Sequence, residues 1–309
     1  FLVGRNSLMK LKTSEFYGEY NGHRVQDLER LLSNYDAQGK SERVWLAGDS
    51  TLDNKYWVLH ENCKASPALA SVLDAPSRAK PDVSHHLNVL LAAHSANSVC
   101  INTAVEASTL GERTSKLWPQ DEFIRDNISE GDTLIVSVGG NDIALMPTVA
   151  TVANMCCLVH LGKPSSIDAG SALGSSHFIK LFGERTQSYI ERITAKTKPR
   201  RVLVCMVYYL DEKRTDSWAD TALRCLKYDD DPERLQRLIR AVYEHATKNI
   251  KLEGTEVIPC PLFLALDGKD TTDYVARVEP SAKGGRKLAE FLAAQCGIVA
   301  PDIELRMRR

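Results

Sequence analysis

The chain has 309 residues, 43% of them hydrophobic, so it can bury a substantial core, and we expect residues 1–309 to form one domain. Its 39 lysines and arginines nearly balance its 40 aspartates and glutamates, which indicates neither a nucleic-acid partner nor an acidic membrane surface. No window approaches the roughly 18 continuous apolar residues of a membrane span, so we expect a cytoplasmic protein without one. A start at Phe1 leaves room for an upstream targeting segment.

Five short β-rich runs recur along the chain, with helical patterns between them. They cover residues 43–47, 98–101, 133–138, 201–207 and 255–260. Continuous apolar stretches such as Leu134-Ile135-Val136 are typical of strands that are covered on both faces. The pattern therefore predicts an α/β fold of three α/β/α layers, with a five-stranded parallel sheet at the centre.

Helices are predicted where apolar residues recur with the 3.6-residue period. One such face precedes the first strand, over residues 25–35. Another lies over residues 235–246, with Pro232 near its start. A last helix is expected over about residues 281–296, after the final strand.

Two segments, residues 144–178 and 210–231, do not follow this alternation. The first is rich in small residues, and the second ends in a run of charges. Ligands of parallel α/β sheets bind at the carboxyl ends of the strands, so insertions there are candidate lids or pocket walls. The alternative, that both are only surface loops, stays open.

The eight cysteines do not indicate a disulfide framework or a metal site. Cys100, Cys205 and Cys260 lie in apolar runs, so we expect them to be reduced core residues. Cys156 and Cys157 are adjacent, which is a poor geometry for a mutual disulfide, and no spacing of cysteine and histidine indicates zinc. Because no phosphate-binding glycine motif is present either, we expect no cofactor.

The first run that can carry chemistry is Gly48-Asp49-Ser50-Thr51-Leu52-Asp53-Asn54, where an apolar strand enters a polar turn. A serine that starts a helical stretch has a free backbone N–H, and the positive end of the helix dipole can stabilise an oxyanion there. The alternative interpretation of Ser50 is an ordinary helix N-cap.

The second run is Gly139-Gly140-Asn141-Asp142, which again follows a buried strand. The Asn141 amide can donate to an oxyanion, and the glycines permit close backbone approach. Alone, such a run is an ordinary turn. Together with the Ser50 turn, it indicates one shared site at the carboxyl edge of the sheet.

These two runs resemble the nucleophile block and the Gly-x-Asn-Asp block of the SGNH hydrolase superfamily, the GDSL-type lipases and esterases. The resemblance extends from about residue 43 to residue 297 and implies the family's flavodoxin-like fold. It also implies that Ser50 is the nucleophile, with Asp49 beside it in the site. The Ser50 N–H and the Asn141 side chain would donate to the oxyanion.

The family's intermediate block, commonly Asn-x-Gly-x-x-Gly, is present only in degraded form over residues 102–109. On this register Ala107 takes the place of the oxyanion-hole glycine. Since a backbone N–H is the donor, alanine can supply it if its backbone angles are compatible.

The last block departs from the family, which usually has Asp-x-x-His-Pro before a helix. This chain has Ala276-Arg277-Val278-Glu279-Pro280-Ser281, so Glu279 takes the place of the histidine base, and Ala276 that of its aspartate. An ordinary glutamate, with a pKa of roughly 4.3, is a poor base for a serine hydroxyl. Burial against Val278 and Pro280 can raise that pKa.

Other groups are weaker candidates for the base. His60 follows the nucleophile turn, and His177 lies in the first irregular segment. Asp270 and Asp273 belong to a charged loop before the last block and can hold a base or a substrate hydroxyl. Surface or core histidines and a solvated loop are the alternative interpretations.

The leading hypothesis is a serine-dependent ester or thioester hydrolase, or a related acyltransferase, that acts on a small-molecule acyl substrate. Ser50 would form the acyl intermediate, and Glu279 would be the base. The second hypothesis is a catalytically silent SGNH-like domain that binds a ligand or a partner protein. The third is a changed chemistry, such as that of a lyase or isomerase, in the same pocket. The oligomeric state is not predicted.

Overall fold

A five-stranded parallel sheet lies at the centre of the computed structural model, which describes residues 10–298. The order is β4-β1-β5-β6-β7, and each predicted strand is confirmed to within one residue at either end. The ends of the predicted 1–309 domain lie outside the described residues, so the single domain stays a prediction. The strands are β1 (Glu42–Gly48), β4 (Ser98–Asn102), β5 (Thr133–Ser137), β6 (Arg201–Met206) and β7 (Glu256–Pro261).

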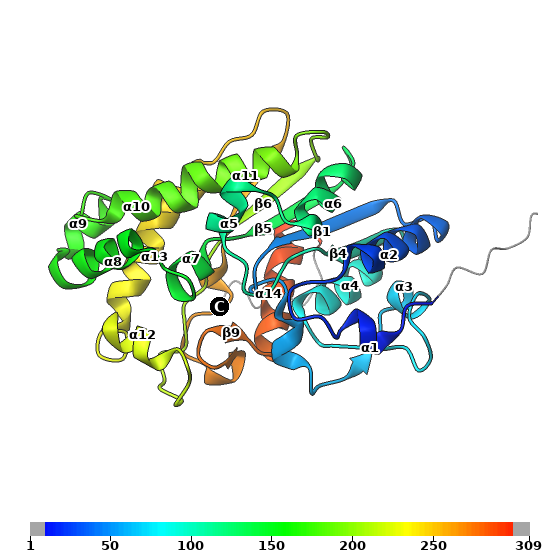
Figure 1. The fold of residues 1–309 in the computed structure, drawn as a ribbon, viewed down its shortest axis with the longest axis horizontal. Helices are drawn as coiled ribbons and strands as arrows, with labels where there is room; N and C mark the ends of the chain where they lie inside the picture. Colours follow the sequence, from blue (N-terminus) through cyan, green and yellow to red (C-terminus); the bar gives the residue numbers. More distant parts are fainter. Residues whose placement is uncertain (1–9, 299–309) are drawn as a thin grey trace, which may run out of the picture.

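Helices cover both faces of the sheet, as the continuous apolar strands predict (Figure 1). Alternate side chains of β1 show the division, because Trp45 packs into one core and Leu46 into the other. On the Leu46 face lie α4 (Val83–His94) and α14 (Ala282–Gln295). The Trp45 face is covered by α2 (Val25–Ala37), α6 (Pro119–Asn127), α11 (Thr186–Ile193) and α13 (Pro232–His245). The structure therefore has the predicted three layers.

Short elements fill the connections between these helices and strands. Cys100, Cys205 and Cys260 are buried in β4, β6 and β7, as expected. None of the helices described over residues 10–298 is both long and apolar enough to cross a membrane. The remaining elements are α1 (Thr13–Phe16), η1 (Asn54–Val58), β2 (Cys63–Lys64), α3 (Pro67–Ala70), β3 (Arg78–Ala79), α5 (Leu110–Ser115), α7 (Gly140–Ala144), η2 (Leu181–Arg185), η3 (Thr247–Asn249), η4 (Leu262–Leu264), η5 (Thr271–Asp273), β8 (Tyr274–Val275) and β9 (Glu279–Pro280).

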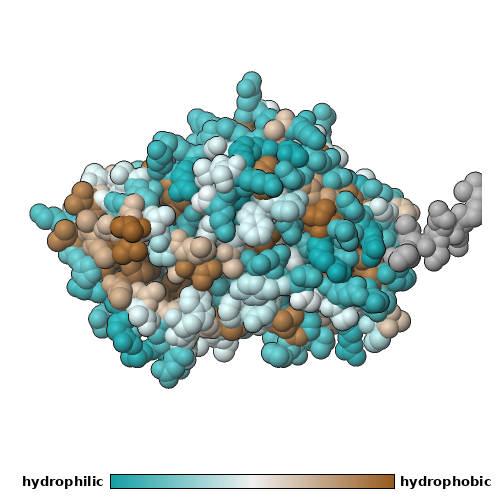
Figure 2. All heavy atoms as spheres, in the orientation of Figure 1, coloured by the Kyte–Doolittle hydropathy of each residue, from teal (hydrophilic) through white to brown (hydrophobic). Residues whose placement is uncertain are grey.

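The two irregular segments are helical and lie at one end of the molecule (Figure 1). Residues 144–178 form α8 (Val149–Leu161), α9 (Pro164–Asp168) and most of α10 (Ser175–Lys180), and residues 210–231 contain α12 (Asp220–Cys225). Figure 2 shows apolar atoms gathered on the surface at this end. Both segments contribute to the wall of a cavity described below, whereas movement as a lid stays a prediction.

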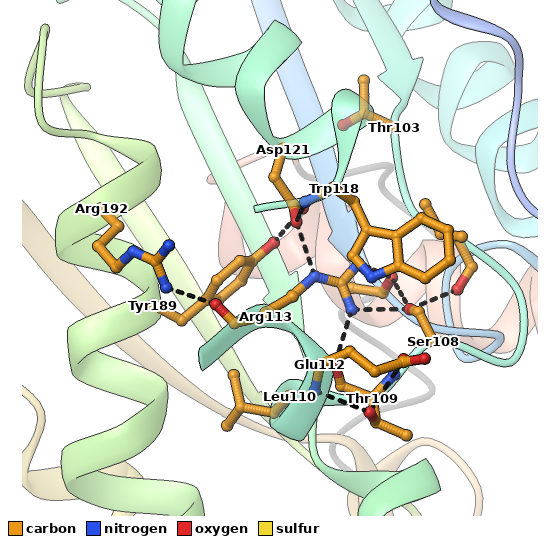
Figure 3. A network of polar contacts seen from close by, with 12 residues as sticks. Thr103, Ser108, Thr109, Leu110, Glu112, Arg113, Trp118, Asp121, Tyr189 and Arg192 are labelled. Carbon is orange, nitrogen blue, oxygen red and sulfur yellow. Dashed lines mark hydrogen bonds and ion pairs between the residues drawn. The ribbon is translucent and has the colours of Figure 1, made fainter. Parts of the chain in front are cut away.

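A buried ion pair holds the turn after β1 against the helices (Figure 3). Arg113 of α5 donates from Nε to Asp121 Oδ2 at 2.9 Å and from Nη2 to the Gly48 carbonyl oxygen at 3.1 Å. Its Nη1 donates to Ser108 Oγ at 2.7 Å, and the Tyr189 hydroxyl donates to Asp121 Oδ1 at 2.7 Å. Both charged side chains are fully buried, so each depends on the other for its hydrogen bonds.

Replacing Arg113 by Met leaves the buried Asp121 carboxylate uncompensated, and we expect this change to cost about 3–5 kcal/mol in the free energy of unfolding. Urea denaturation followed by circular dichroism measures it. The matched control is Arg125→Met, which removes surface ion pairs to Glu122 and Asp126 and is expected to cost much less, because exposed ion pairs contribute little to stability. An equal decrease in the free energy of unfolding in the two variants would show that the buried ion pair contributes no more to stability than the surface pairs do.

Candidate active site

The turn after β1 has a backbone that only glycine fits. Gly48 has φ +136°, and a Cβ atom there would lie 1.7 Å from the Ser137 carbonyl oxygen of β5. The Asp49 N–H donates to that same oxygen at 3.1 Å, and Asp49 Oδ1 accepts the Thr51 N–H at 3.1 Å. Ser50 is thereby held at the carboxyl end of the sheet.

Ser50 lies in this turn and does not begin a helix, because the next helical segment, η1, starts only at Asn54. The prediction that a helix dipole stabilises an oxyanion at Ser50 is therefore wrong. The free backbone N–H is present nonetheless, since the Ser50 N–H donates no hydrogen bond among residues 10–298. It is available to an external oxyanion.

The second predicted run adjoins the first because β5 and β1 are neighbours. Gly139, with φ +98°, turns the chain into α7, and a Cβ there would meet the Phe182 ring at 2.9 Å. Asn141 is buried and donates through Nδ2 to the Ser108 carbonyl oxygen at 3.0 Å. An amide nitrogen carries two hydrogens, so one remains for a ligand.

Asp142 joins this run to the segment that contains Ala107. Its carboxylate accepts the Leu110 N–H at 2.7 Å and the Gly111 N–H at 2.8 Å. Ala107 itself has φ 59°, the left-handed conformation that usually favours glycine and costs alanine roughly 1 kcal/mol. No hydrogen bond from the Ala107 N–H is found in the described chain. The structure thus leaves a second backbone donor free.

Asp53 connects the turn after β1 to the degraded block after β4. It is fully buried, and its carboxylate oxygens accept from Lys55 Nζ at 2.7 and 2.9 Å. The same carboxylate accepts the Asn102 side-chain amide and the Glu106 N–H, each at 3.1 Å. Three donors make four hydrogen bonds to this one buried carboxylate, so Asp53 connects three parts of the site.

Asn54 places Glu279 at the site. Its Nδ2 donates to the Pro280 carbonyl oxygen at 3.0 Å, and its Oδ1 accepts the Val83 N–H at 2.9 Å. The first bond joins η1 to β9, a strand of only Glu279 and Pro280 that lies far along the chain, and the second joins η1 to α4. The Tyr208 hydroxyl also donates to the Val278 carbonyl oxygen at 2.7 Å.

Glu279 is buried beside Ser50, and no cation compensates it in the described structure. Burial raises the pKa of Glu279 to about 8, with a lowering contribution from the nearby Ser50 hydroxyl and a raising one from the Asp49 charge. Glu279 Oε2 has no hydrogen-bond partner among the described residues. This carboxyl group can therefore exchange a proton near neutral pH.

A second buried carboxyl group, Glu106, was not singled out from the sequence. Its Oε1 accepts from Trp57 Nε1 at 3.3 Å and lies 3.5 Å from the Tyr20 hydroxyl, while Oε2 has no partner among the described residues. Burial, followed by the charges of Glu279 and Asp53, raises the pKa of Glu106 to about 9. Its position next to Ala107, in the degraded block, is the sequence feature from which Glu106 could have been predicted as a site residue.

The other candidate bases lie elsewhere. His60 is exposed, and His177 Nε2 lies 3.1 Å from Thr151 Oγ1 on α8. Asp270 and Asp273 form ion pairs with lysines of α14. None of the four lines the cavity at Ser50, and no group of three His, Cys, Asp or Glu residues in the described chain is arranged to hold a metal.

Ser50, Asn141 and Glu279 line one cavity of about 330 Å³. Asp49 lines it too, and burial raises the pKa of Asp49 to about 6. The wall away from these polar groups is apolar and comes from α8, α10, η2, α12 with the residue after it, and α13. It includes Met155, Phe178, Phe182, Leu223, Leu226, Leu235, Leu238, Ile239 and Val242. A polar end with a hydroxyl and an apolar body suit an acyl group.

Comparison with protein-family models found no match, and no curated protein sequence matches the chain. Solved structures do match. The chain is similar to GDSL-type lipases and esterases.

The lipase Lip_vut3 from a goat rumen metagenome is 14% identical, with 82% of this chain and 97% of that chain covered and a TM-score of 0.48. A member of the lipolytic G-D-S-L family from Veillonella parvula is 12% identical, with 82% and 97% covered and a TM-score of 0.42. Axe2, an acetylxylan esterase from Geobacillus stearothermophilus, is 12% identical, with 85% and 99% covered and a TM-score of 0.39. At these values no activity carries over.

The raised pKa values of Glu279 and Glu106 predict how stability depends on pH. Between the ordinary glutamate pKa of roughly 4.3 and the raised values, the folded state keeps protons that the unfolded chain has released, so the free energy of unfolding falls as pH rises. We expect Glu279→Gln and Glu106→Gln each to reduce this fall between pH 5 and 9 in urea denaturation series.

The matched control is Glu122→Gln, which changes a carboxylate whose side chain is 44% exposed and should leave the slope unchanged. Some slope should persist in all variants, since burial also raises the pKa of Asp49 and of Asp82. Identical slopes in wild type, Glu279→Gln and Glu106→Gln would contradict the assignment of buried, protonated carboxyl groups.

Proposed function

We propose that the protein is a member of the SGNH hydrolase superfamily that hydrolyses acyl esters or thioesters, or transfers the acyl group to another acceptor. Ser50 is the nucleophile, and Glu279 is the base in place of the usual histidine. The observation that carries this proposal is that both side chains and Asn141 line the polar end of one apolar cavity.

In the first step the Glu279 carboxylate takes the proton of the Ser50 hydroxyl as Oγ forms a bond to the carbonyl carbon of the substrate. The oxyanion that forms accepts from the N–H groups of Ser50 and Ala107 and from the Asn141 amide. When the carbon–oxygen or carbon–sulfur bond to the leaving group breaks, the departing alcohol or thiol takes the proton from Glu279. An acyl group remains on Ser50.

In the second step a water molecule, or another hydroxyl or thiol, attacks the acyl carbon. Glu279 takes the proton of this acceptor, and the bond to Ser50 Oγ breaks as the hydroxyl recovers a proton. The product is an acid in hydrolysis, a new ester in transfer to a hydroxyl, or a new thioester in transfer to a thiol. The same two residues therefore serve both steps, and the reaction needs no oxidant, reductant or metal.

The raised pKa explains how a carboxylate can do this work. A base is most effective when its pKa lies near the working pH, and the pKa of Glu279 lies closer to that range than the pKa of an exposed glutamate. Burial raises the pKa of both groups, and a negative charge on Glu279 raises the pKa of Glu106 further, so ionisation of Glu279 favours the protonated form of Glu106. Protonated Glu106 then adds no second negative charge beside it.

Hydrolysis of p-nitrophenyl esters from acetate to long-chain acyl groups tests the proposal. Activity should rise with pH as Glu279 loses its proton, with a midpoint at about pH 8. Ser50→Ala should abolish turnover, and Glu279→Gln should lower kcat by roughly 10²–10⁴-fold and remove the acidic limb. The matched control is Asp270→Asn, which changes a half-buried carboxylate outside the cavity and should keep the wild-type profile.

Asn141→Ala removes one oxyanion donor, and we expect kcat to fall by roughly 10²–10³-fold with little change in the pH midpoint. Steady-state kinetics on the ester that turns over fastest measures both quantities. An unchanged kcat would remove Asn141 from the oxyanion hole.

The alternatives give different results. A folded protein without turnover of any ester, but with a ligand whose affinity falls in Ser50→Ala, supports the silent binding domain. Turnover that survives Ser50→Ala and is lost in Glu279→Gln supports a changed chemistry such as that of a lyase or isomerase. Either result overturns the hydrolase.

A further inference from the structure

An exposed apolar patch lies on the helices that enclose the cavity. We define the rim patch as Leu145, Met146, Val149, Val152 and Trp218. Val149 is 89% exposed, and Met146 is 58% exposed. Large apolar side chains at this exposure mark an interaction site when they lie together. Apolar atoms gather on this end of the surface in Figure 2.

The rim patch and the cavity are continuous. Val152 of α8 and Trp218, which precedes α12, each line the cavity and are also exposed. Other residues that do both are small or apolar. They are Ala144, Pro147, Cys156, Ala222 and Cys225. The cavity therefore opens between α8 and α12, inside the apolar patch.

The wall that follows Asp142 and includes α8 carries no formally charged side chain. Residues 143–162 contain no Asp, Glu, Lys or Arg, and the first charged residue after them is Lys163. On the other side of the mouth, Lys213, Arg214 and Asp216 are exposed before Trp218 and include both signs. Arg224, Lys227, Asp230 and Asp231 are exposed on and after α12 and also include both signs, so the charges on this side are mixed. An occupant of the rim patch is thus bound by apolar contact.

The shape of the site identifies the occupant. A flat protein partner would cover the rim patch and leave the apolar cavity behind it unfilled. A lipid aggregate offers a broad apolar surface for the exposed side chains together with a single chain that can leave it and enter the cavity. Trp side chains favour the boundary between lipid and water, which fits Trp218 at the mouth.

We propose that the rim patch docks on the surface of a neutral lipid aggregate or bilayer, from which one acyl chain enters the cavity between α8 and α12. The helix pair lies on the interface without spanning it. Delivery of an ester group to Ser50 rests on the proposed function, whereas docking itself does not. The substrate class is a long-chain acyl lipid.

Sedimentation with phosphatidylcholine vesicles tests the docking. Wild type should bind, and binding should persist in 0.5 M salt because no charge cluster contributes. In the double variant Met146→Asp/Val149→Asp, we expect affinity to fall by roughly a hundredfold, since two apolar side chains are lost and two charges are added. These residues do not line the cavity.

Leu264→Asp is the matched control, because Leu264 is 68% exposed on η4, outside the rim patch. It should bind vesicles as wild type does. Circular dichroism of each variant establishes that it is folded. Absence of wild-type binding, or equal binding by the double variant, overturns the proposal.

Analytical ultracentrifugation separates lipid docking from self-association. A wild-type dimer that the double variant converts to a monomer would make the rim patch an interface between copies and overturn lipid docking. Wild-type hydrolysis of water-soluble p-nitrophenyl acetate tests Ser50 separately. Acetate turnover without vesicle binding overturns docking alone, and vesicle binding without any ester turnover supports docking while it overturns the proposed function.

Discussion

Burial of the Glu279 carboxyl group beside Ser50 determines what this site can do. A carboxylate in water is too weak a base for a serine hydroxyl, and a carboxylate paired with a cation is weaker still. Glu279 is only 6% exposed and has no cation beside it in the described structure, so its pKa rises toward the working range. The fold pays a cost in stability at high pH, because both Glu279 and Glu106 must be ionised there inside the protein.

Buried polar side chains hold this group in position. Asp53 joins the turn after β1 to the block after β4, and Asp142 joins that block to the turn after β5. Asn54 holds β9, so the residue in the histidine position lies at Ser50 although more than two hundred residues separate them. Arg113 donates a hydrogen bond to the Gly48 carbonyl oxygen at the end of β1. Each of these side chains is satisfied within the fold, whereas Glu279 and Glu106 each retain an unpartnered oxygen.

The strands and the Ser50 and Asn141 turns could be predicted from the sequence because their signals lie in short runs of neighbouring residues. Continuous apolar runs indicate strands covered on both faces, and polar turns at their carboxyl ends must lie at one edge of a parallel sheet. Glu279 could be placed by its Pro-Ser frame. Its raised pKa could not, because burial is a property of the packed site. The cavity between α8 and α12 likewise depends on how the two insertions pack against α13.

Glu106 shows what a family pattern hides. Ala107 could be assigned in the degraded block because it replaces a glycine of the family pattern. The neighbouring Glu106 has no counterpart in that pattern. Its importance comes from contacts with Trp57 and Tyr20, which lie in other parts of the chain. The helix expected at Ser50 was wrong for the opposite reason, since hydrogen bonds around Asp49 close a turn before any helix begins.

The most direct measurement is the rate at which a fluorophosphonate labels Ser50 between pH 5 and 9, with the labelled peptide identified by mass spectrometry, in wild type and in Glu279→Gln. If Glu279 activates Ser50, labelling in wild type accelerates as the pH rises through about 8, and the variant loses that acceleration. If Ser50 is not labelled, or if both proteins are labelled with the same pH dependence, Glu279 is not the base for Ser50.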